Sequence, residues 1–186
     1  EFVNITHSTI QCAMVAVHTP EGVVLYGNDY KLDNSPTFGE PPNYRRLKAL
    51  SKIGVKVLIV DCLYASDDRK TPSEKIARGL LEDVFFTTDN KNSGIIITTF
   101  SSHIARLKTI NEMGQRLGRE VVFFGRSLGK YLQAAKNVGS GSFLKSSQIF
   151  TYRRQLERSL KTINKNKNKY HVVCTGQQGE PGSILD

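Results

Sequence analysis

The fold is decided by IIITTFSSHIARLKTINEMGQRLGREVVFFGRSL, residues 95–128. Ile95–Thr99 is a β-branched run and Val121–Phe124 an apolar run, and each suits a short strand buried on both faces of a parallel sheet. Between them, apolar residues recur every three or four positions, which predicts one buried face of a helix that Gly118 can end: Ile104, Leu107, Ile110, Met113 and Leu117. The stretch therefore predicts a right-handed β-α-β unit.

The two ends of this unit carry groups that suit phosphate. Ser101 or Ser102 can cap the start of the helix. Open α/β sheets bind ligands beyond the carboxyl ends of their strands, which here are Ser101–His103 and Gly125–Ser127. Free N–H groups at a helix start attract anions, and Arg126 could hold a phosphate by two hydrogen bonds. A capped helix with Arg126 in a surface ion pair is the alternative, and spacing alone leaves both interpretations open.

The composition is that of a globular protein with an excess of basic residues. The 186 residues include 26 lysines and arginines against 17 acidic residues, and the resulting charge of +9 favours a polyanionic partner such as nucleic acid. No apolar run approaches the ~20 residues that cross a membrane, so no membrane partner is expected. Residues 2–5 suit a strand, so no secretory signal is expected. The cysteines lack metal-binding spacing and fit a reduced, cytoplasmic protein: Cys12, Cys62 and Cys174.

In the first half, the pattern predicts a hairpin over 10–26, a short helix over 44–53 and a buried strand over 55–60. The next helix is expected to open at Thr71–Glu74, which has the spacing of a capping box with proline at the first helical position. Its buried face is expected to consist of apolar residues: Ile76, Ala77, Leu80, Leu81 and Val84.

The composition shifts near residues 61–70. Strands and turns dominate before this segment, whereas strands and helices alternate after it. We interpret the shift as part of one domain, residues 1–66, followed by most of another, residues 67–186. The alternation predicts an α/β fold with a mostly parallel sheet. Later elements are expected in three places: helices over 128–137 and 152–163 and a strand over 170–174.

Polar groups follow three of the expected strands, at Ser101–His103, Gly125–Ser127 and Thr175–Gly182. If these strands are parallel, all three segments face one cleft, and N–H groups of the last, glycine-rich loop could form an anion-binding nest. A tight surface turn is the alternative for that loop. The patterns GxxxxGK[ST] and GxGxxG, which mark the common nucleotide-binding loops, are absent.

Two residues of the first half suit a metal site. His7 follows the strand-like Phe2–Thr6, and Asp29 follows the strand-like Val23–Tyr26. A neutral imidazole and a carboxylate are suitable zinc ligands. Two ligands do not make a metal site, however, and a capped histidine and a turn aspartate explain the same residues.

Seven ordered motifs resemble signatures of the ribonuclease J group, beta-CASP nucleases of the metallo-β-lactamase superfamily. They are THS at 6–8, HTPEGVV at 18–24, GNDYKLD at 27–33, TPSE at 71–74, TTFSSHIARL at 98–107, GREVVFFGRSL at 118–128 and CTGQQGEPGS at 174–183. The match runs over nearly the whole chain. The resemblance implies a mostly parallel-sheet beta-CASP domain with helices on both faces, together with a partial metallo-β-lactamase αββα segment.

The resemblance also assigns roles. His7 matches a zinc-binding histidine of the third metallo-β-lactamase motif, and Asp29 matches the aspartate of the fourth motif, which bridges two zinc ions. Asp61 matches the acidic residue of beta-CASP motif A, which takes part in catalysis by supporting the site and handling protons rather than by direct ligation. The residues that would line the RNA cleft by analogy are Ser102, His103, Gly125, Arg126, Ser127, Gly176 and Gly179.

The implied activity is that of a ribonuclease acting on single-stranded RNA in RNA processing and decay. Two zinc ions, or other divalent ions, would activate water and stabilise the transition state. A 5′-monophosphate pocket implies 5′-to-3′ exonuclease activity, and the balance with endonuclease activity stays open. The resemblance allows a homodimer of the complete protein.

The HxHxDH motif, which supplies most metal ligands in this group, does not occur in the sequence, and neither do the later histidine motifs. The resemblance places the first before Glu1 and the others after Asp186. The chain is therefore expected to be part of a longer protein. By itself it is expected neither to bind two zinc ions nor to cleave RNA.

Two further hypotheses remain. The first is a non-catalytic beta-CASP module that binds RNA or a partner protein. The second is a nucleotide-binding α/β domain. An HxHxDH motif upstream would favour the nuclease over the module, whereas saturable binding of free nucleotide without preference for RNA would favour the nucleotide-binding domain.

Overall fold

The computed structural model describes residues 1–185, which divide into two compact units. Unit 1 contains residues 1–77, and unit 2 begins at Arg78. The boundary therefore falls inside helix α2 (Glu74–Thr87). The domain limits expected from the sequence, with a change after residue 66, stay a prediction.

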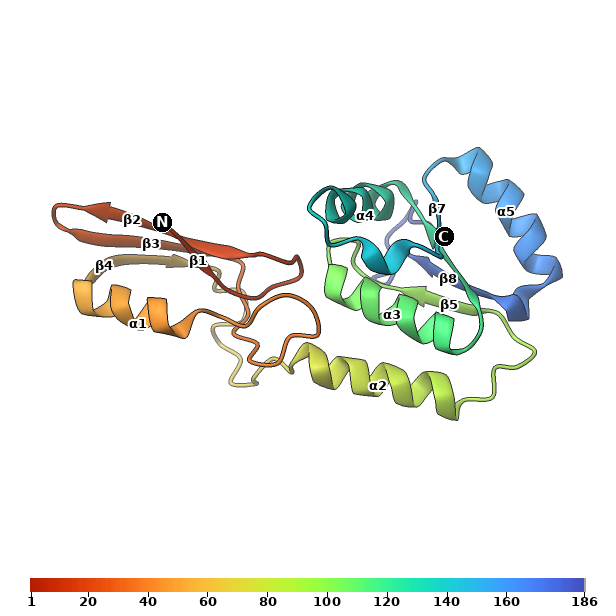
Figure 1. The fold of residues 1–186 in the computed structure, drawn as a ribbon, viewed down its shortest axis with the longest axis horizontal. Coiled ribbons are helices and arrows are strands. Elements are labelled where there is room, and N and C mark those ends of the chain that lie inside the picture. The colour runs from red at the N-terminus through yellow and green to blue at the C-terminus, as the bar shows by residue number, and fades with distance from the viewer. Residues whose placement is uncertain (186) are drawn as a thin grey trace. The chain divides into compact units, whose positions relative to one another are not determined.

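Unit 1 is built on a four-stranded sheet in which the strands lie in sequence order: β1 (Phe2–Asn4), β2 (Ala13–Thr19), β3 (Gly22–Asn28) and β4 (Val55–Val60). The first three strands are antiparallel, and the hairpin predicted over 10–26 is confirmed by the pairing of Thr19 with Gly22. β4 is parallel to β3 because α1 (Tyr44–Ile53) carries the chain back along the sheet, as Figure 1 shows.

The core of unit 1 lies between α1 and one face of the sheet. Buried residues alternate along β2 and β3, as expected for strands with one covered face. Leu50 supplies the fully buried contact from α1. The buried cluster consists of Val3, Ile5, Met14, Ala16, Val23, Leu25 and Leu50.

The prediction that residues 55–60 form a buried strand is wrong in one respect. The strand exists, but Val57, Leu58 and Ile59 are exposed. β4 is an edge strand that pairs only with β3, and the buried cluster under α1 is made mainly by the other three strands. Position in the sheet, which the sequence does not state, decides the exposure of these residues.

The prediction for the start of α2 is also wrong, and the prediction for its buried face is wrong for three of the five residues. The helix begins at Glu74, and Ser73 Oγ accepts a hydrogen bond from Lys75 N at 3.1 Å, so the cap lies two residues later than the predicted Thr71. Of the residues expected to be buried, Ile76, Leu80 and Val84 are exposed, between 56% and 62% accessible. Ala77 and Leu81 are half-buried. In unit 2, the opposite side of α2 contacts α3 (Ile104–Arg116) through two ion pairs, Arg78–Glu112 and Glu82–Arg116.

Unit 2 confirms the predicted α/β fold with a parallel sheet. Its four strands lie in the order β5-β8-β6-β7, and every pair is parallel. The strands are β5 (Ile95–Thr98), β6 (Glu120–Phe124), β7 (Gln148–Phe150) and β8 (Tyr170–Cys174). The remaining helices are α4 (Arg126–Asn137), α5 (Arg153–Lys165) and the short 3₁₀ segments Ser142–Leu144 and Lys167–Lys169. β8 thus lies between the two strands of the predicted β-α-β unit.

Helices cover both faces of this sheet (Figure 1). On one face, Val122 and Phe124 of β6 pack with Ile163 of α5. The alternate residues Val121 and Phe123 point to the other face, where α3 and α4 contact β6. β6 is therefore buried on both sides, which explains its uninterrupted apolar sequence.

The start of α3 differs from the prediction that Ser101 or Ser102 caps it. The cap position is His103, whose side chain makes no capping hydrogen bond. The end agrees with the prediction: Gly118 follows the helix with φ of 69°. None of the helices in residues 1–185 is long and apolar enough to span a membrane.

Candidate functional site

Three of the predicted site residues of unit 1 follow strands that end at the same edge of its sheet. β1 and β3 run in one direction because each is antiparallel to β2, and β4 is parallel to β3. His7, Asp29 and Asp61 follow the carboxyl ends of β1, β3 and β4 respectively. The backbone N–H of Asp61 donates to Asn28 O at 3.2 Å, which fixes the ends of β3 and β4 side by side.

The side chains of these residues offer suitable ligand atoms. His7 is exposed, and its Nδ1 lies 3.2 Å from Ser8 Oγ, so Nε2 is the ring nitrogen that this contact leaves available. The Asp29 carboxylate is exposed, whereas Asp61 Oδ1 accepts a hydrogen bond from Leu63 N at 3.1 Å. Within residues 1–185, no three or more His, Cys, Asp or Glu side chains gather closely enough to hold a metal ion.

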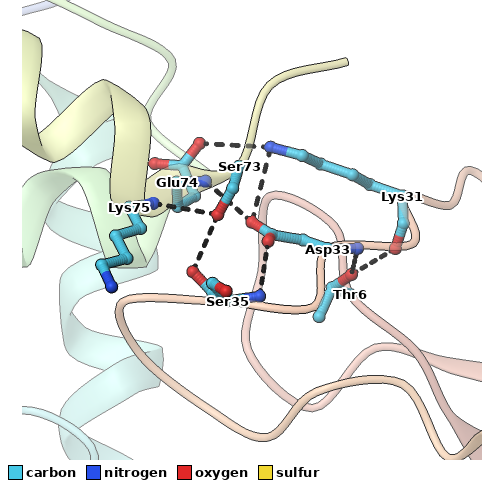
Figure 2. Close-up of polar contacts among 7 residues, drawn as sticks. All are labelled: Thr6, Lys31, Asp33, Ser35, Ser73, Glu74 and Lys75. Atoms are coloured by element: carbon cyan, nitrogen blue, oxygen red, sulfur yellow. Dashed lines mark hydrogen bonds and ion pairs between the residues drawn. The ribbon is translucent and has the colours of Figure 1, made fainter. Parts of the chain in front are cut away.

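A polar cluster around the buried residues Thr6, Asp33 and Glu74 lies next to these segments (Figure 2). We call it the Asp33 cluster, and its members are Thr6, Lys31, Asp33, Ser35, Ser73, Glu74 and Lys75. The Asp33 carboxylate accepts hydrogen bonds from Ser35 N at 2.9 Å and from Glu74 N at 2.7 Å. It thereby takes up one of the N–H groups that the start of α2 leaves unpaired within the helix.

The charges of the Asp33 cluster compensate one another. Lys31 Nζ lies 3.7 Å from an Asp33 carboxylate oxygen and 3.6 Å from a Glu74 carboxylate oxygen. Burial opposes ionisation of Asp33, but the hydrogen bonds from Glu74, Ser73 and Ser35 and the charge of Lys31 outweigh it, so the pKa of Asp33 lies below its ordinary value. Asp33 is therefore a buried anion with a complete set of partners.

In unit 2, the predicted polar segments meet at the carboxyl edge of the sheet. Thr99 N donates to Cys174 O at 3.1 Å, which joins the ends of β5 and β8. Gly125 N donates to Phe150 O at 3.0 Å, which joins the ends of β6 and β7. Ser102 and His103, which follow β5, are half-buried at this edge.

The glycine-rich loop after β8 folds back over the turn at Gly125. A Cβ at Gly125 would lie 3.2 Å from Ile184, and one at Gly176 would lie 2.7 Å from Ser183 Oγ. Gly179, at φ of 69°, lies in an exposed turn where Gln178 N donates to the Glu180 carboxylate at 3.1 Å. At the loop predicted to bind an anion, the backbone N–H of Gln178 is therefore already bonded to a carboxylate of the protein, that of Glu180.

Arg126 opens α4 and lines a groove of about 550 Å³ beside the end of β7. Its guanidinium is exposed and forms no ion pair with any described residue, whereas Ser127 is exposed on the same turn. Lys130, Gln133, Asn137 and Tyr152 also line the groove. At Gly129, α4 lies close to Thr151, and both residues line this groove. A Cβ at Gly129 would lie only 2.2 Å from the Thr151 methyl group.

Sequence reasoning did not find Asp33, Lys130 or Tyr152. Asp33 binds a helix that begins 41 residues later, which no local pattern reports. Lys130 follows Arg126 by one helical turn, and this spacing was a usable signal for a basic surface on α4. Tyr152 reaches the groove only because β7 is parallel to β6.

The sequence of unit 2 matches a family model. Residues 92–186 match the family described as "Ribonuclease J, beta-CASP domain", which is about half of the chain. The chain belongs to the ribonuclease J beta-CASP family. Its similarity to whole ribonucleases J extends over unit 1 as well. Over all of this chain, it is 46% identical to ribonuclease J of Pyrococcus abyssi and 42% identical to ribonuclease J of Methanocaldococcus jannaschii.

The chain spans about two fifths of the length of these ribonucleases J, 41% and 42% respectively. A bacterial relative, ribonuclease J of Helicobacter pylori, is 28% identical over the whole chain, which covers 25% of that protein. The matched region of both relatives with more than 40% identity extends over both units of this chain.

Proposed function

We propose that the chain is the beta-CASP part, with flanking catalytic-domain segments, of a zinc-dependent ribonuclease that hydrolyses phosphodiester bonds of single-stranded RNA. The reaction is mainly 5′-to-3′ exonucleolytic and serves RNA processing and decay in the cytoplasm. The observation that carries the proposal is the identity of more than two fifths to two ribonucleases J across the whole chain. Within it, residues 1–66 belong to the metallo-β-lactamase segment and residues 67–186 to the beta-CASP domain.

The donor atoms of unit 1 support the metal assignment. A metal-binding histidine typically engages a hydrogen-bonding partner through its second ring nitrogen, as His7 does with Ser8. His7 Nε2 and the Asp29 carboxylate are the proposed zinc ligands, and the remaining ligands come from the part of the relatives' length that this chain does not span. Bound metal would polarise the phosphoryl group and activate water. Asp61, at the end of β4, would hold a proton near the reacting phosphate.

The carboxyl edge of the unit 2 sheet supports RNA binding. Ser102, His103 and Ser127 offer hydrogen-bonding groups, and Arg126 offers an unpaired guanidinium that can hold a phosphate through two hydrogen bonds. Gly125 and Gly176, both at positive φ, let the loop after β8 pack against this edge, where Ile184 and Ser183 lie next to them. Arg126 would therefore bind the 5′ phosphate.

The test compares decay of 5′-monophosphate and 5′-triphosphate RNA by a protein extended to the length of its relatives, with zinc or manganese. We expect faster decay of the monophosphate, loss of activity in Asp29→Asn, and a smaller monophosphate preference in Arg126→Ala. Exposed Arg154, with no role in the proposal, supplies the matched control Arg154→Ala. Equal rates on both RNAs with internal cuts would contradict the exonuclease assignment.

A non-catalytic RNA-binding module is the second candidate. The groove on α4 favours it, because Arg126, Lys130 and Tyr152 can bind RNA without any metal ligand. RNA binding that survives in the full-length protein when hydrolysis is undetectable at any metal concentration would support this candidate. Tight binding of free nucleotide with no preference for RNA would support a nucleotide-binding domain instead.

A further inference from the structure

We propose that Thr6 and Asp33 are positioning residues that hold the loop carrying Asp29 against the segment carrying His7. The proposal rests on the proposed function for the roles of His7 and Asp29 as metal ligands. The contacts of the Asp33 cluster, all within unit 1, carry the argument (Figure 2).

Thr6 joins the two ligand-bearing segments. It pairs with Lys31 in an antiparallel bridge, in which Lys31 N donates to Thr6 O at 2.7 Å. The Thr6 hydroxyl adds two bonds: it donates to Lys31 O and accepts from Asp33 N at 2.9 Å. Because His7 follows Thr6 directly and Asp29 precedes Lys31 by two residues, this hydroxyl fixes how the two segments lie together.

Asp33 anchors the same loop from its other end. Its side chain is buried, and its two carboxylate oxygens accept from two different segments, Ser35 N and Glu74 N. Ser73 Oγ donates to Ser35 O at 2.9 Å, so the loop is attached to the first turn of α2 through both backbone and side chains. The loop from Asp29 to Ser35 therefore cannot shift unless several buried hydrogen bonds break together.

This arrangement suits a metal ligand whose own side chain has no support. Asp29 is exposed, and its carboxylate forms no hydrogen bond or ion pair with a side chain or backbone group of residues 1–185. Hydrogen bonds from neighbouring residues that orient metal ligands typically change metal affinity by about tenfold or more. Thr6 and Asp33 supply such bonds through the backbone that follows Asp29, at Lys31, Asp33 and Ser35.

The experiment uses the protein extended to the length of its relatives, which would carry the remaining ligands, with Co²⁺ alone as the probe, followed by nuclear magnetic resonance of His7 and Asp29. In the unmodified chain, we expect Co²⁺ to perturb both residues with one common midpoint. Thr6→Val removes the hydroxyl but keeps the shape of the side chain. It should raise the Co²⁺ concentration at the midpoint by about tenfold. Thr6→Ser keeps the hydroxyl and should restore it. Thr19→Val, which removes a hydroxyl bonded to Gly22 O elsewhere in the sheet, should leave the midpoint unchanged.

Amide hydrogen exchange shows whether the variants act through the loop. Exchange of the Asp33 amide should accelerate in Thr6→Val and return to the original rate in Thr6→Ser. Separate midpoints for His7 and Asp29, or a common midpoint that Thr6→Val does not change, would overturn the proposal. If the midpoint shifts as expected while the full-length protein fails to hydrolyse RNA, the positioning role stands and the proposed nuclease function fails.

Discussion

At the scale of single residues, His171 of β8 is unusual among the buried groups. Its side chain is inaccessible, it stacks edge-on against Phe85 with ring centroids 5.1 Å apart, and neither ring nitrogen has a hydrogen-bond partner in the described structure. Burial, with a smaller effect from the charge of Arg119, lowers the pKa of His171 to about 4. The imidazole is therefore neutral in the folded protein at neutral pH.

We predict that His171 makes the protein sensitive to mild acid. Its folded pKa of about 4 lies below its ordinary value of 6.5, so between these values the unfolded chain binds more protons. Its contribution is complete above pH 6.5 and declines as the pH falls toward 4, by up to about 3 kcal/mol. His171→Leu should remove this slope and raise stability at pH 5, as measured by urea unfolding. Parallel pH profiles of the two proteins would contradict the prediction.

A second prediction at the scale of single residues concerns Gly129, which lets α4 lie close to the end of β7. Alanine favours a helix by about 1 kcal/mol over glycine, but its Cβ at position 129 would lie 2.2 Å from the Thr151 methyl group. We expect Gly129→Ala to lower the unfolding free energy by roughly 1–3 kcal/mol despite the propensity gain. Gly79→Ala in α2, where no atom lies within 4 Å of the added group, should raise it. Equal effects on thermal melting would refute the packing argument.

At the scale of elements, helix α2 shows what the sequence can and cannot predict. Its existence followed from the spacing of apolar residues after Thr71–Glu74, but its start and its buried side did not. The start is fixed by Ser73 and by Asp33, which lies 41 residues earlier. The buried side contains Phe85, one helical turn after the half-buried Leu81, and it is flanked by Arg78 and Glu82, two charged residues that no apolar pattern marks. Contacts with other parts of the chain therefore determine both where α2 begins and which of its sides is buried.

Asp33→Asn tests the start of α2. The amide presents a donor to either Ser35 N or Glu74 N, each of which donates to the carboxylate, so one buried N–H loses its acceptor. We expect a loss of roughly 1–3 kcal/mol in unfolding free energy and faster exchange of the Ser35 or Glu74 amide. The loss should shrink as the pH falls through the lowered pKa of Asp33, because protonation removes the same acceptor.

The matched control for this element is Asp67→Asn. Asp67 also accepts a backbone hydrogen bond, from Arg69 N at 3.0 Å, but it lies in a surface loop beside an exposed arginine. Its substitution should leave stability almost unchanged, as is usual for exposed pairs. A loss as large as that of Asp33→Asn would show that burial is not the reason for the effect.

At the scale of the whole molecule, the way strand pairing brings distant segments together explains why only part of the candidate site could be predicted from the sequence. The residues around His7, Asp29, Gly125 and Arg126 stand in contiguous motifs, so the sequence could name them. The groove on α4 combines residues from two segments, 126–137 and 151–152, that meet only through the parallel pairing of β6 and β7. No spacing rule connects Arg126 with Tyr152, and the tyrosine was therefore missed.

The net charge of +9 and this groove lead to a prediction about RNA binding by the chain itself. Each lysine or arginine that neutralises a phosphate of a single strand contributes about 0.7 to the slope of log affinity against log salt. Lys130→Ala should therefore weaken binding of a short oligouridylate and reduce the slope by about 0.7. Tyr152, 68% exposed in the groove, would stack on a base. Tyr152→Ala should cost about 1 kcal/mol or more without changing the slope.

The two variants separate the groove from a general effect of charge. Lys145 is exposed in the same unit but does not line the groove, so Lys145→Ala removes the same charge elsewhere. If the groove binds RNA, Lys130→Ala weakens binding more than Lys145→Ala, and only Tyr152→Ala weakens it independently of salt, as fluorescence anisotropy would show. Equal losses for both lysines, with no loss for Tyr152→Ala, would mean that RNA is attracted by the overall positive field rather than held in this groove.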